Sequence, residues 1–177
     1  MLSLGIDFGT SGVRAIAINS ANQAIAQSRY SFESTLAAAT PSIWQQALWA
    51  VIGDLKVSAR SQITRIAING TSGTVLLCDE AAQPITPALM YNDDRSRFVV
   101  PKIADVAPAS SPTLSATSSL AKALWWHDTL EPHEIERVSY LAHQADWLAS
   151  LLHGQPQISD YHNALKLGYD VSALAYP

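Results

Sequence analysis

The feature that most constrains this chain is the apolar run Leu2–Phe8 together with the turn "GTSG" that follows it at residues 9–12. A single aspartate interrupts the run. A second apolar run, Val13–Asn19, begins directly after the turn. Two short runs of Leu, Ile, Val and Ala around a glycine-containing turn predict a β-hairpin. We expect a third strand over Ala24–Phe32 to extend it.

The letters "GTSG" return at residues 70–73, between the apolar runs Ile63–Asn69 and Thr74–Cys78. We interpret these runs as a second strand pair around a second turn. Helices are predicted where apolar residues recur every three or four positions after Thr40-Pro41, and also over 120–129, from 131 and over 145–152. Residues 99–119 are rich in Pro, Ser, Thr and Ala and read as a long loop or a small excursion. Helices that alternate with strands after an opening hairpin predict an α/β fold with a mixed sheet and helices on its faces.

Composition points to one compact domain over residues 1–177, because 48% of the residues are hydrophobic and 15% are charged. The net charge of −4 gives no reason to expect nucleic acid as a partner. No apolar run is long enough to span a bilayer, so no membrane partner is expected either. The single cysteine and the strand-like start at Leu2 favour a cytoplasmic protein, or a plastid stroma if a targeting segment has been removed.

The first turn has the composition of a phosphate-binding site. Gly9 and Gly12 allow the backbone to approach a ligand closely, so that successive N–H groups can converge on phosphate oxygens. The hydroxyls of Thr10 and Ser11 add further donors. The same four residues are also ordinary turn formers, and the turn is neither a Walker A nor a Gly-x-Gly-x-x-Gly motif.

Asp7 raises the interest of this turn, since an aspartate inside an apolar strand is costly unless it has a task. Beside bound phosphates it could hold Mg²⁺, through water because Mg²⁺ gives up its hydration shell reluctantly. Arg14 either meets an oxygen of a transferred phosphate or is a charged residue on a sheet edge.

The stretch "GIDFGTSGVRA" resembles the first phosphate hairpin of the N-terminal domain of the FGGY carbohydrate kinases, which belong to the actin-like, ribonuclease-H-like ATPases. Three later segments resemble that family in the same order. They are "MYNDDRS" for its Trp-x-Asp-x-Arg segment, "SSLAKALWWHDTLEPHEIERV" for its Lys-x-x-x-Trp helix and Glu-Pro turn, and "QADWLASLLHGQPQISDYHNALKLGYDV" for its Asp-Tyr-Leu helix, Gly turn and Ser-Asp-Tyr segment.

The resemblance implies ATP-dependent phosphorylation of a small sugar or polyol with Mg²⁺, and a pentulose such as xylulose or ribulose is favoured. It places Asp7 beside the nucleotide phosphates and Mg²⁺, and the second turn at the sugar. The residues implied at the phosphates are Gly9, Thr10, Ser11, Gly12 and Arg14, and those at the sugar are Gly70, Thr71, Ser72, Asn92, Asp93 and Arg95. "NDDRS" is also good turn chemistry in itself.

Two departures from the family pattern matter. Xylulose kinases of this family carry Gln-Met-His-Gly where this chain has Thr71-Ser72-Gly73, and the hydroxyl-rich turn resembles a divergent group of predicted pentulose kinases of cyanobacteria and plants. The family's catalytic base and adenosine pocket belong to a C-terminal domain. We therefore expect residues 1–177 to form one wall of the active site, to need that domain as a partner, and to turn over no sugar alone. Another actin-like ATPase and a non-catalytic sugar- or partner-binding module remain alternatives.

Other conspicuous residues have structural interpretations. Helical spacing places Trp44, Trp125 and Trp147 in the core, and leaves Trp49 and Trp126 to pack against loops or the C-terminal domain. The five histidines have no metal-ligand spacing, and Cys78 reads as a buried thiol. Asp146 is expected to cap the helix after it, while the polar residues Asp160, Asn163 and Lys166 are expected to hold the cleft wall together.

Overall fold

The computed structural model of the chain describes residues 1–176. The chain folds into two compact units. Unit 1 comprises Met1–Thr71 and Leu148–Gly154, and unit 2 comprises Ser72–Trp147 and the chain from Gln155 onward. The prediction of one domain over the whole chain stays a prediction.

Strands and helices alternate along the chain after three initial strands, as the sequence predicts for the α/β class. The strands are β1 (Leu2–Phe8), β2 (Gly12–Ile18), β3 (Ala24–Ser31), β4 (Ile63–Asn69), β5 (Val75–Cys78) and β6 (Tyr140–His143). The helices are α1 (Thr35–Ala38), α2 (Pro41–Gly53), α3 (Val57–Arg60), α4 (Val100–Ala104), α5 (Ser119–Thr129), α6 (Pro132–Ile135), α7 (Gln144–His153) and α8 (Tyr161–Ala164). Short 3-10 turns cover Arg95–Val99, Pro112–Leu114 and Leu165–Leu167.

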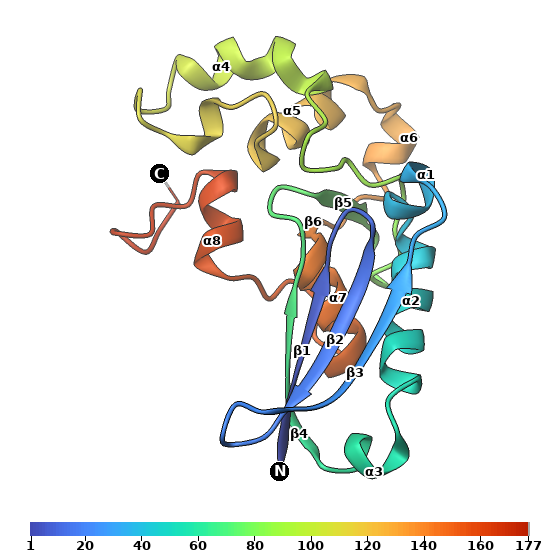
Figure 1. The fold of residues 1–177 in the computed structure, drawn as a ribbon. Helices are drawn as coiled ribbons and strands as arrows, with labels where there is room; N and C mark the ends of the chain where they lie inside the picture. The colour runs from blue at the N-terminus through green and yellow to red at the C-terminus, as the bar shows by residue number, and fades with distance from the viewer. Residues whose placement is uncertain (177) are drawn as a thin grey trace. The chain divides into compact units, whose positions relative to one another are not determined.

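Unit 1 is built on a four-stranded mixed sheet in the order β3-β2-β1-β4 (Figure 1). β1 and β2 form the predicted antiparallel hairpin, and β3 extends it. β1 also pairs in parallel with β4, so the carboxyl ends of these two strands lie at the same edge of the sheet. This edge carries the first turn after β1 and the start of the second turn after β4.

The helix α2 covers one face of this sheet because its apolar residues recur at helical spacing. It begins with Pro41 at its first position, where a missing N–H costs nothing. Trp44, Leu48 and Val51 are fully buried, and the indole Nε1 of Trp44 donates to the carbonyl of Ala38 at 2.7 Å. The predicted helix and the predicted core position of Trp44 are confirmed.

Unit 2 contains a two-stranded antiparallel sheet of β5 and β6, in which Val75 faces His143 and Cys78 faces Tyr140. The prediction that β5 pairs with the strand before the second turn is therefore wrong. All four residues of β5 are buried, and Val75 also exchanges backbone hydrogen bonds with Leu89. Local pattern identifies a buried strand, but its partner, β6, follows more than sixty residues later and gives no local signal.

The helix α5 reverses the expectation for two tryptophans. Trp126 is buried at 3% exposure in an apolar cluster with Val75, Leu77 and Leu89, whereas Trp125 is partly buried at the edge of that cluster. The helix begins after Ser118, whose hydroxyl accepts from the N–H of Ala121. A rotation of one helical position separates the two indoles, and helical spacing pointed to the wrong one. Trp147 is buried, as predicted.

The segment between residues 99 and 119 contains α4 and a 3-10 turn, so it is a small helical excursion. Val99 and Ile103 pack there against Ala121 of α5. In residues 1–176, no helix is long and apolar enough to cross a membrane. Within the same range, no three His, Cys, Asp or Glu side chains gather where they could hold a metal ion.

Candidate functional site

Asp7, the residue before the last of β1, lies on the exposed face of the sheet in unit 1. Leu4, Ile6 and Phe8 of the same strand point into the core, and Asp7 alternates with them on the opposite face. The expectation that this aspartate bears a burial cost is therefore wrong, because its carboxylate lies in solvent. The evidence that Asp7 is functional comes instead from the residues beside it in the sheet, which are described below.

The first turn is closed by a hydrogen bond from the N–H of Gly9 to the carbonyl of Gly12, at 3.0 Å. The Gly9 N–H is thus occupied, and the donors left for a ligand are those of Thr10 and Ser11, which are both exposed. Gly12 is required by the fold, because a Cβ there would lie 2.2 Å from the carbonyl oxygen of Tyr30 on β3. The turn can offer amides and hydroxyls to a phosphate group, through fewer amides than its sequence suggests.

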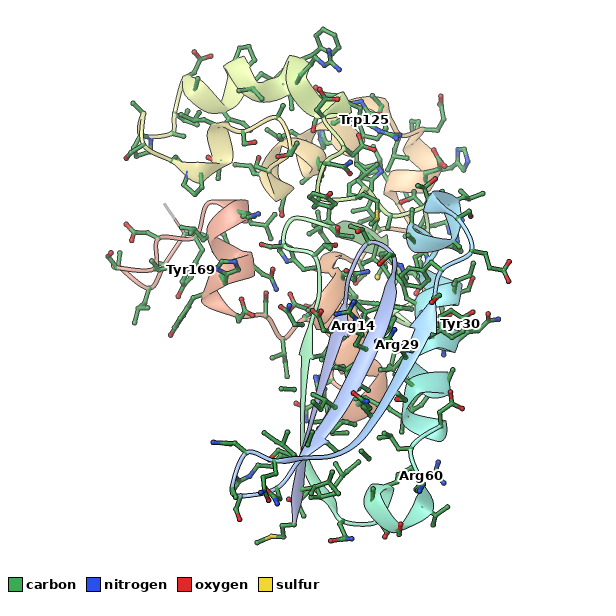
Figure 2. The ribbon with its side chains drawn as sticks, in the orientation of Figure 1. Arg14, Arg29, Tyr30, Arg60, Trp125 and Tyr169 are labelled. Carbon is green, nitrogen blue, oxygen red and sulfur yellow. The ribbon has the colours of Figure 1, made fainter. Side chains whose placement is uncertain are left out.

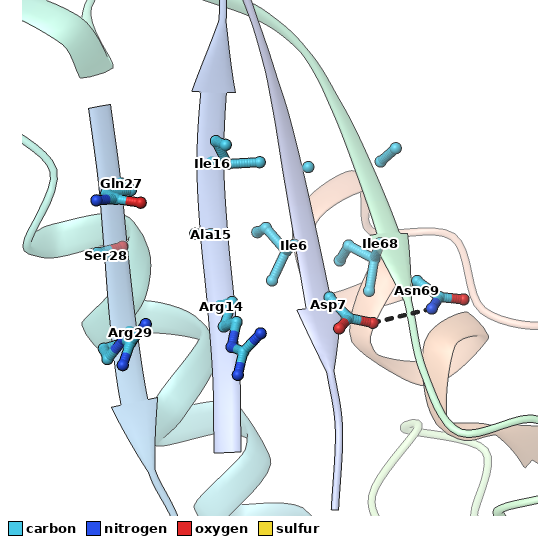
Figure 3. Close-up of a pocket in the computed structure, with 12 residues that line it drawn as sticks. Ile6, Asp7, Arg14, Ala15, Ile16, Gln27, Ser28, Arg29, Ile68 and Asn69 are labelled. Atoms are coloured by element: carbon cyan, nitrogen blue, oxygen red, sulfur yellow. Dashed lines mark hydrogen bonds between the residues drawn. The ribbon is translucent and has the colours of Figure 1, made fainter. Parts of the chain in front are cut away.

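A row of four polar side chains crosses the exposed face of the sheet at the level of Asp7 (Figure 3). Arg29, Arg14, Asp7 and Asn69 are successive register partners on β3, β2, β1 and β4. The Nδ2 atom of Asn69 donates to Oδ1 of Asp7 at 2.9 Å. This row lines part of an open hollow of about 800 Å³ on the sheet face.

Arg14 and Arg29 project from neighbouring strands (Figure 2) and face each other directly in the sheet register. Like charges placed opposite each other in a strand pair are destabilising. Neither guanidinium makes a hydrogen bond or an ion pair with the part of the chain that the structure describes. Arg14 is thus available to an anion beside Asp7, as the phosphate interpretation needs.

The second turn is divided between the two units. Gly70 and Thr71 follow β4 in unit 1, at the edge of the sheet that also carries the first turn. Ser72 and Gly73 belong to unit 2. The sequence-predicted site residues Asp7, 9–12, Arg14 and 70–71 therefore share one edge of unit 1, and the remainder lie in unit 2.

In unit 2 the Ser72-Gly73 peptide is fixed by side chains from distant segments. Nζ of Lys166 donates to the carbonyl of Ser72 at 3.3 Å, and Nζ of Lys122 donates to the carbonyl of Gly73 at 2.7 Å. Gly73 has a φ of +85°, which a side chain would adopt only with strain. The Oγ atom of Ser72 is buried and finds no hydrogen-bond partner among the described residues, so it is left for a ligand or a water.

Asp93 and Arg95 form a bidentate pair. Nε of Arg95 donates to both carboxylate oxygens of Asp93, at 2.8 and 3.0 Å. Partial burial acts to raise the pKa of Asp93, but the hydrogen bonds and charge of Arg95, with the charge of Lys122, outweigh it and hold the pKa below its ordinary value. The Cζ atom of Arg95 lies 5.1 Å from the ring centre of Trp125. Asn92, next to this pair, is exposed.

Lys122 is the functional candidate that sequence reasoning missed. It is completely buried, which is rare for lysine, and its Nζ also donates to the carbonyl of Met90 at 2.6 Å. Burial lowers the pKa of Lys122 to about 8 against the opposing charge of Asp93, and the charges of Lys166 and Arg95 lower it further. The only sequence signal was its place in the Lys-x-x-x-Trp pattern.

Asp146 is not a helix cap, because α7 already begins at Gln144. Its carboxylate accepts from Oγ of Ser159 at 2.6 Å and from Nδ2 of Asn163 at 3.3 Å, and it lies 3.4 Å from Nδ1 of His143. Asp160 does act as a cap, since it accepts from the N–H of Asn163 at the start of α8. These polar residues hold unit 2 together, and Lys166 reaches Ser72 as described above.

Cys78 is an inert buried thiol, as expected from the sequence. Burial raises its pKa to about 11, so the nucleophilic thiolate is not formed at neutral pH.

Comparison with known proteins gives a consistent result. The profile described as "FGGY family of carbohydrate kinases, N-terminal domain" matches residues 2–176. A xylulose kinase of Lactococcus lactis is 26% identical over 166 residues, which cover 85% of this chain and 32% of that protein. The chain thus spans about a third of that relative's length.

Solved structures share the fold. A xylulose kinase from Brucella ovis has a TM-score of 0.87 at 23% identity, and the match covers 100% of this chain and 39% of that one. Plasmodium falciparum glycerol kinase, solved with ADP, has a TM-score of 0.81 at 18% identity, with 99% and 39% covered. At these identities the likeness shows the fold, an actin-like, ribonuclease-H-like α/β architecture.

Proposed function

We propose a function from the premise that this chain belongs to the FGGY family of carbohydrate kinases and forms its N-terminal domain. The full-length protein transfers the γ-phosphoryl group of ATP to a hydroxyl of a small sugar or polyol. A pentulose such as xylulose or ribulose is favoured, because the curated relatives that match are xylulose kinases. This chain supplies the phosphate-facing turn and a sugar-facing surface.

The observation that carries the proposal is the edge of unit 1 where Asp7 lies beside the first turn. The Asp7 carboxylate is exposed, one of its oxygens is held by Asn69, and Arg14 is free on the neighbouring strand. A carboxylate oxygen and an amide oxygen are hard ligands of the kind that Mg²⁺ prefers. Bound Mg²⁺ would neutralise charge on the phosphates, and Asp7 would hold it through water.

We assign the sugar-facing role to polar groups that include both hydrogen-bond donors and acceptors. In unit 2 these groups are those of Ser72, Asn92, Asp93 and Arg95. The family resemblance assigns the same role to Gly70 and Thr71, which belong to unit 1. The unpartnered Oγ of Ser72 supports this assignment, because a buried hydroxyl without a partner is stabilised when a ligand pairs with it. A site that pairs each sugar hydroxyl also rejects an analogue that lacks one.

The transfer itself also needs a general base. The attacking sugar oxygen bonds to the γ-phosphorus as that phosphorus leaves the bridging oxygen of ADP, and the hydroxyl proton passes to a base. We assign the base and the adenosine pocket to the C-terminal domain of the full-length protein.

The test is an assay of ADP release by the full-length protein with xylulose, ribulose, pentitols, gluconate and glycerol. We expect sugar-dependent turnover that requires Mg²⁺, with a pentulose best. Asp7→Ala should abolish turnover, while Ser72→Ala should mainly raise the KM for the sugar. Sugar binding without ADP release would overturn the proposal in favour of a binding module, and an equal loss of nucleotide affinity in both variants would overturn the division of roles between the two turns.

A further inference from the structure

The helix α5 presents Lys122 and Trp125 three residues apart, on one side of the helix and toward the same segment of unit 2. Nζ of Lys122 donates to the carbonyl of Met90, the residue just before Tyr91. The indole of Trp125 lies under the guanidinium of Arg95 at 5.1 Å. The Met90–Arg95 segment is therefore held at both ends by a single helix.

Lys122 makes a second hydrogen bond to the proposed sugar-facing surface. The same Nζ atom donates at 2.7 Å to the carbonyl of Gly73. Gly73 follows Ser72, whose Oγ has no hydrogen-bond partner among the described residues. One ammonium thus joins two segments whose donors and acceptors face the sugar in the proposed function. The two carbonyls lie 49 and 32 residues from Lys122 in the sequence.

We infer that Lys122 is a positioning residue for sugar binding, which fixes the carbonyl of Gly73 in the Ser72-Gly73 turn and that of Met90 in the Met90–Arg95 segment, and that Trp125 orients Arg95 within that segment. This inference rests on the proposed function. It assigns no contact between either side chain and the sugar, because both act through the residues they hold.

The burial of Lys122 makes the loss of its hydrogen bonds costly. A carbonyl that loses its donor inside the protein keeps the cost of its desolvation. Lys122 donates to the carbonyl of Gly73 and shares the carbonyl of Met90 with the N–H of Asp93, which donates to it at 3.0 Å. Replacement by methionine keeps the length of the side chain and removes both hydrogen bonds. The segments would stay joined by the N–H of Tyr91, which donates to Oγ1 of Thr74 at 2.9 Å, and by the backbone pair of Val75 and Leu89. What the variant loses is the hold on the Gly73 and Met90 carbonyls, while the apolar packing around α5 is retained.

The experiment compares full-length wild type with Lys122→Met, Trp125→Leu and the control Lys102→Met. Lys102 is an exposed lysine of α4 that pairs with Asp128, and it takes no part in holding either segment. Kinetics with the best sugar give the KM for sugar and for ATP separately, and amide hydrogen exchange reports on residues 72–75 and 90–95.

We expect Lys122→Met to raise the KM for the sugar about tenfold or more, with the KM for ATP changed less than about twofold. Exchange should accelerate in both segments. Trp125→Leu should accelerate exchange in 90–95 alone and raise the sugar KM less, and Lys102→Met should change neither.

The inference is overturned if Lys122→Met leaves both segments protected, or if it raises both KM values equally, as a general loss of structure would. If Lys122→Met does not fold, an unchanged sugar KM and unchanged exchange in Trp125→Leu overturn it instead. Hydrogen exchange needs no catalytic activity. A wild-type protein that releases no ADP with any sugar would therefore count against the proposed function, while the exchange data still decide whether Lys122 holds the two segments.

Discussion

Asn69 and Asp7 occupy equivalent positions at the ends of two adjacent parallel strands, and the Nδ2 of Asn69 donates to the Oδ1 of Asp7 at 2.9 Å. Asn69, which precedes the second "GTSG", therefore donates a hydrogen bond to Asp7, which lies just before the first. Asn69 lacks the negative charge that would suit a second metal site. It instead orients the carboxylate of Asp7 through Oδ1, and it makes no hydrogen bond to Oδ2.

The first prediction concerns this contact. Asn69→Ala should weaken Mg²⁺-nucleotide binding by the full-length protein about threefold to tenfold, because a hydrogen bond to a charged acceptor contributes about 1 kcal/mol when it is exposed. Titration calorimetry with an ATP analogue in Mg²⁺ measures it. The matched control is Asn92→Ala, an exposed asparagine of unit 2, which should leave nucleotide affinity unchanged. Equal nucleotide affinities for Asn69→Ala and wild type would remove Asn69 from the phosphate site.

The second prediction concerns the buried hydroxyl of Ser72. Without ligand, Ser72→Ala should stabilise the protein by about 1 kcal/mol, because an unpartnered buried hydroxyl is lost. The same change should weaken sugar binding. Thermal unfolding with and without sugar measures both effects.

Thr86 supplies the control for Ser72, since its Oγ1 is also buried without a partner among the described residues. Thr86→Val should raise the unfolding temperature in a similar way and leave the shift caused by sugar unchanged. A stabilised Ser72→Ala variant that still binds sugar normally would show that the hydroxyl is only a packing defect.

The third prediction separates two glycines of the first turn. Gly12→Ala should destabilise the fold by about 1–3 kcal/mol, because its Cβ would lie 2.2 Å from the carbonyl oxygen of Tyr30. Gly9→Ala should fold normally, since its Cβ would meet nothing closer than the carbonyl oxygen of Gly12 at 3.6 Å. Denaturant unfolding measures the difference.

The two glycine variants also carry information on function. Any loss of nucleotide affinity in Gly9→Ala, at unchanged stability, would report the close approach of a ligand to the turn. Equal unfolding free energies for Gly9→Ala and Gly12→Ala would contradict the assigned contact with Tyr30.

The fourth prediction follows from the buried thiol of Cys78. Burial raises its pKa from 9.0 to about 11, so the folded state keeps a proton that the unfolded chain releases at lower pH. Its contribution to stability is complete below pH 9 and is lost as the pH rises toward 11, by about 3 kcal/mol in all. Cys78→Ala should therefore show a shallower fall of unfolding free energy than wild type between pH 9 and 11.

Lys122 titrates over a neighbouring pH range and is shared by wild type and Cys78→Ala, so its effect cancels in the comparison. The charge and hydrogen bond of Cys78 add to burial in raising the pKa of Tyr140, so the difference between the two curves reports on the Cys78–Tyr140 pair. Burial raises the pKa of Tyr140, and burial lowers that of Lys122 to about 8. Parallel curves for wild type and Cys78→Ala would show that the thiol titrates in the folded state as it does in the unfolded chain.

Sequence periodicity predicted the elements whose signal is local. The hairpin β1–β2, the strand β3 and the helix α2 lie close to where alternation and helical spacing place them. The four-residue strand β6 was missed, because so short a run carries little periodic signal. The predicted burial of Trp125 and Trp126 was exchanged, since adjacent positions of a helix differ in direction by just over a quarter of a turn and an error of one position decides which is buried.

The candidate site divides in the same way. The phosphate-facing residues follow from a contiguous motif, and Asp93 and Arg95 from a short one. Lys122 could not be predicted to be buried, because lysine is among the residues most often exposed. Its partners, the carbonyls of Gly73 and Met90, are backbone groups that every residue carries, so no side-chain pattern marks them.

The sequence by itself determined the fold class, the opening hairpin with its glycine turn, and the family to which the chain belongs, because each depends on residues that are neighbours along the chain. The tertiary structure alone decided that β5 pairs with β6, that Asp7 is exposed beside Asn69, and that a buried lysine joins two segments of unit 2. These depend on contacts between distant residues. Such contacts form only when burial of the core selects one arrangement among many that the local pattern permits.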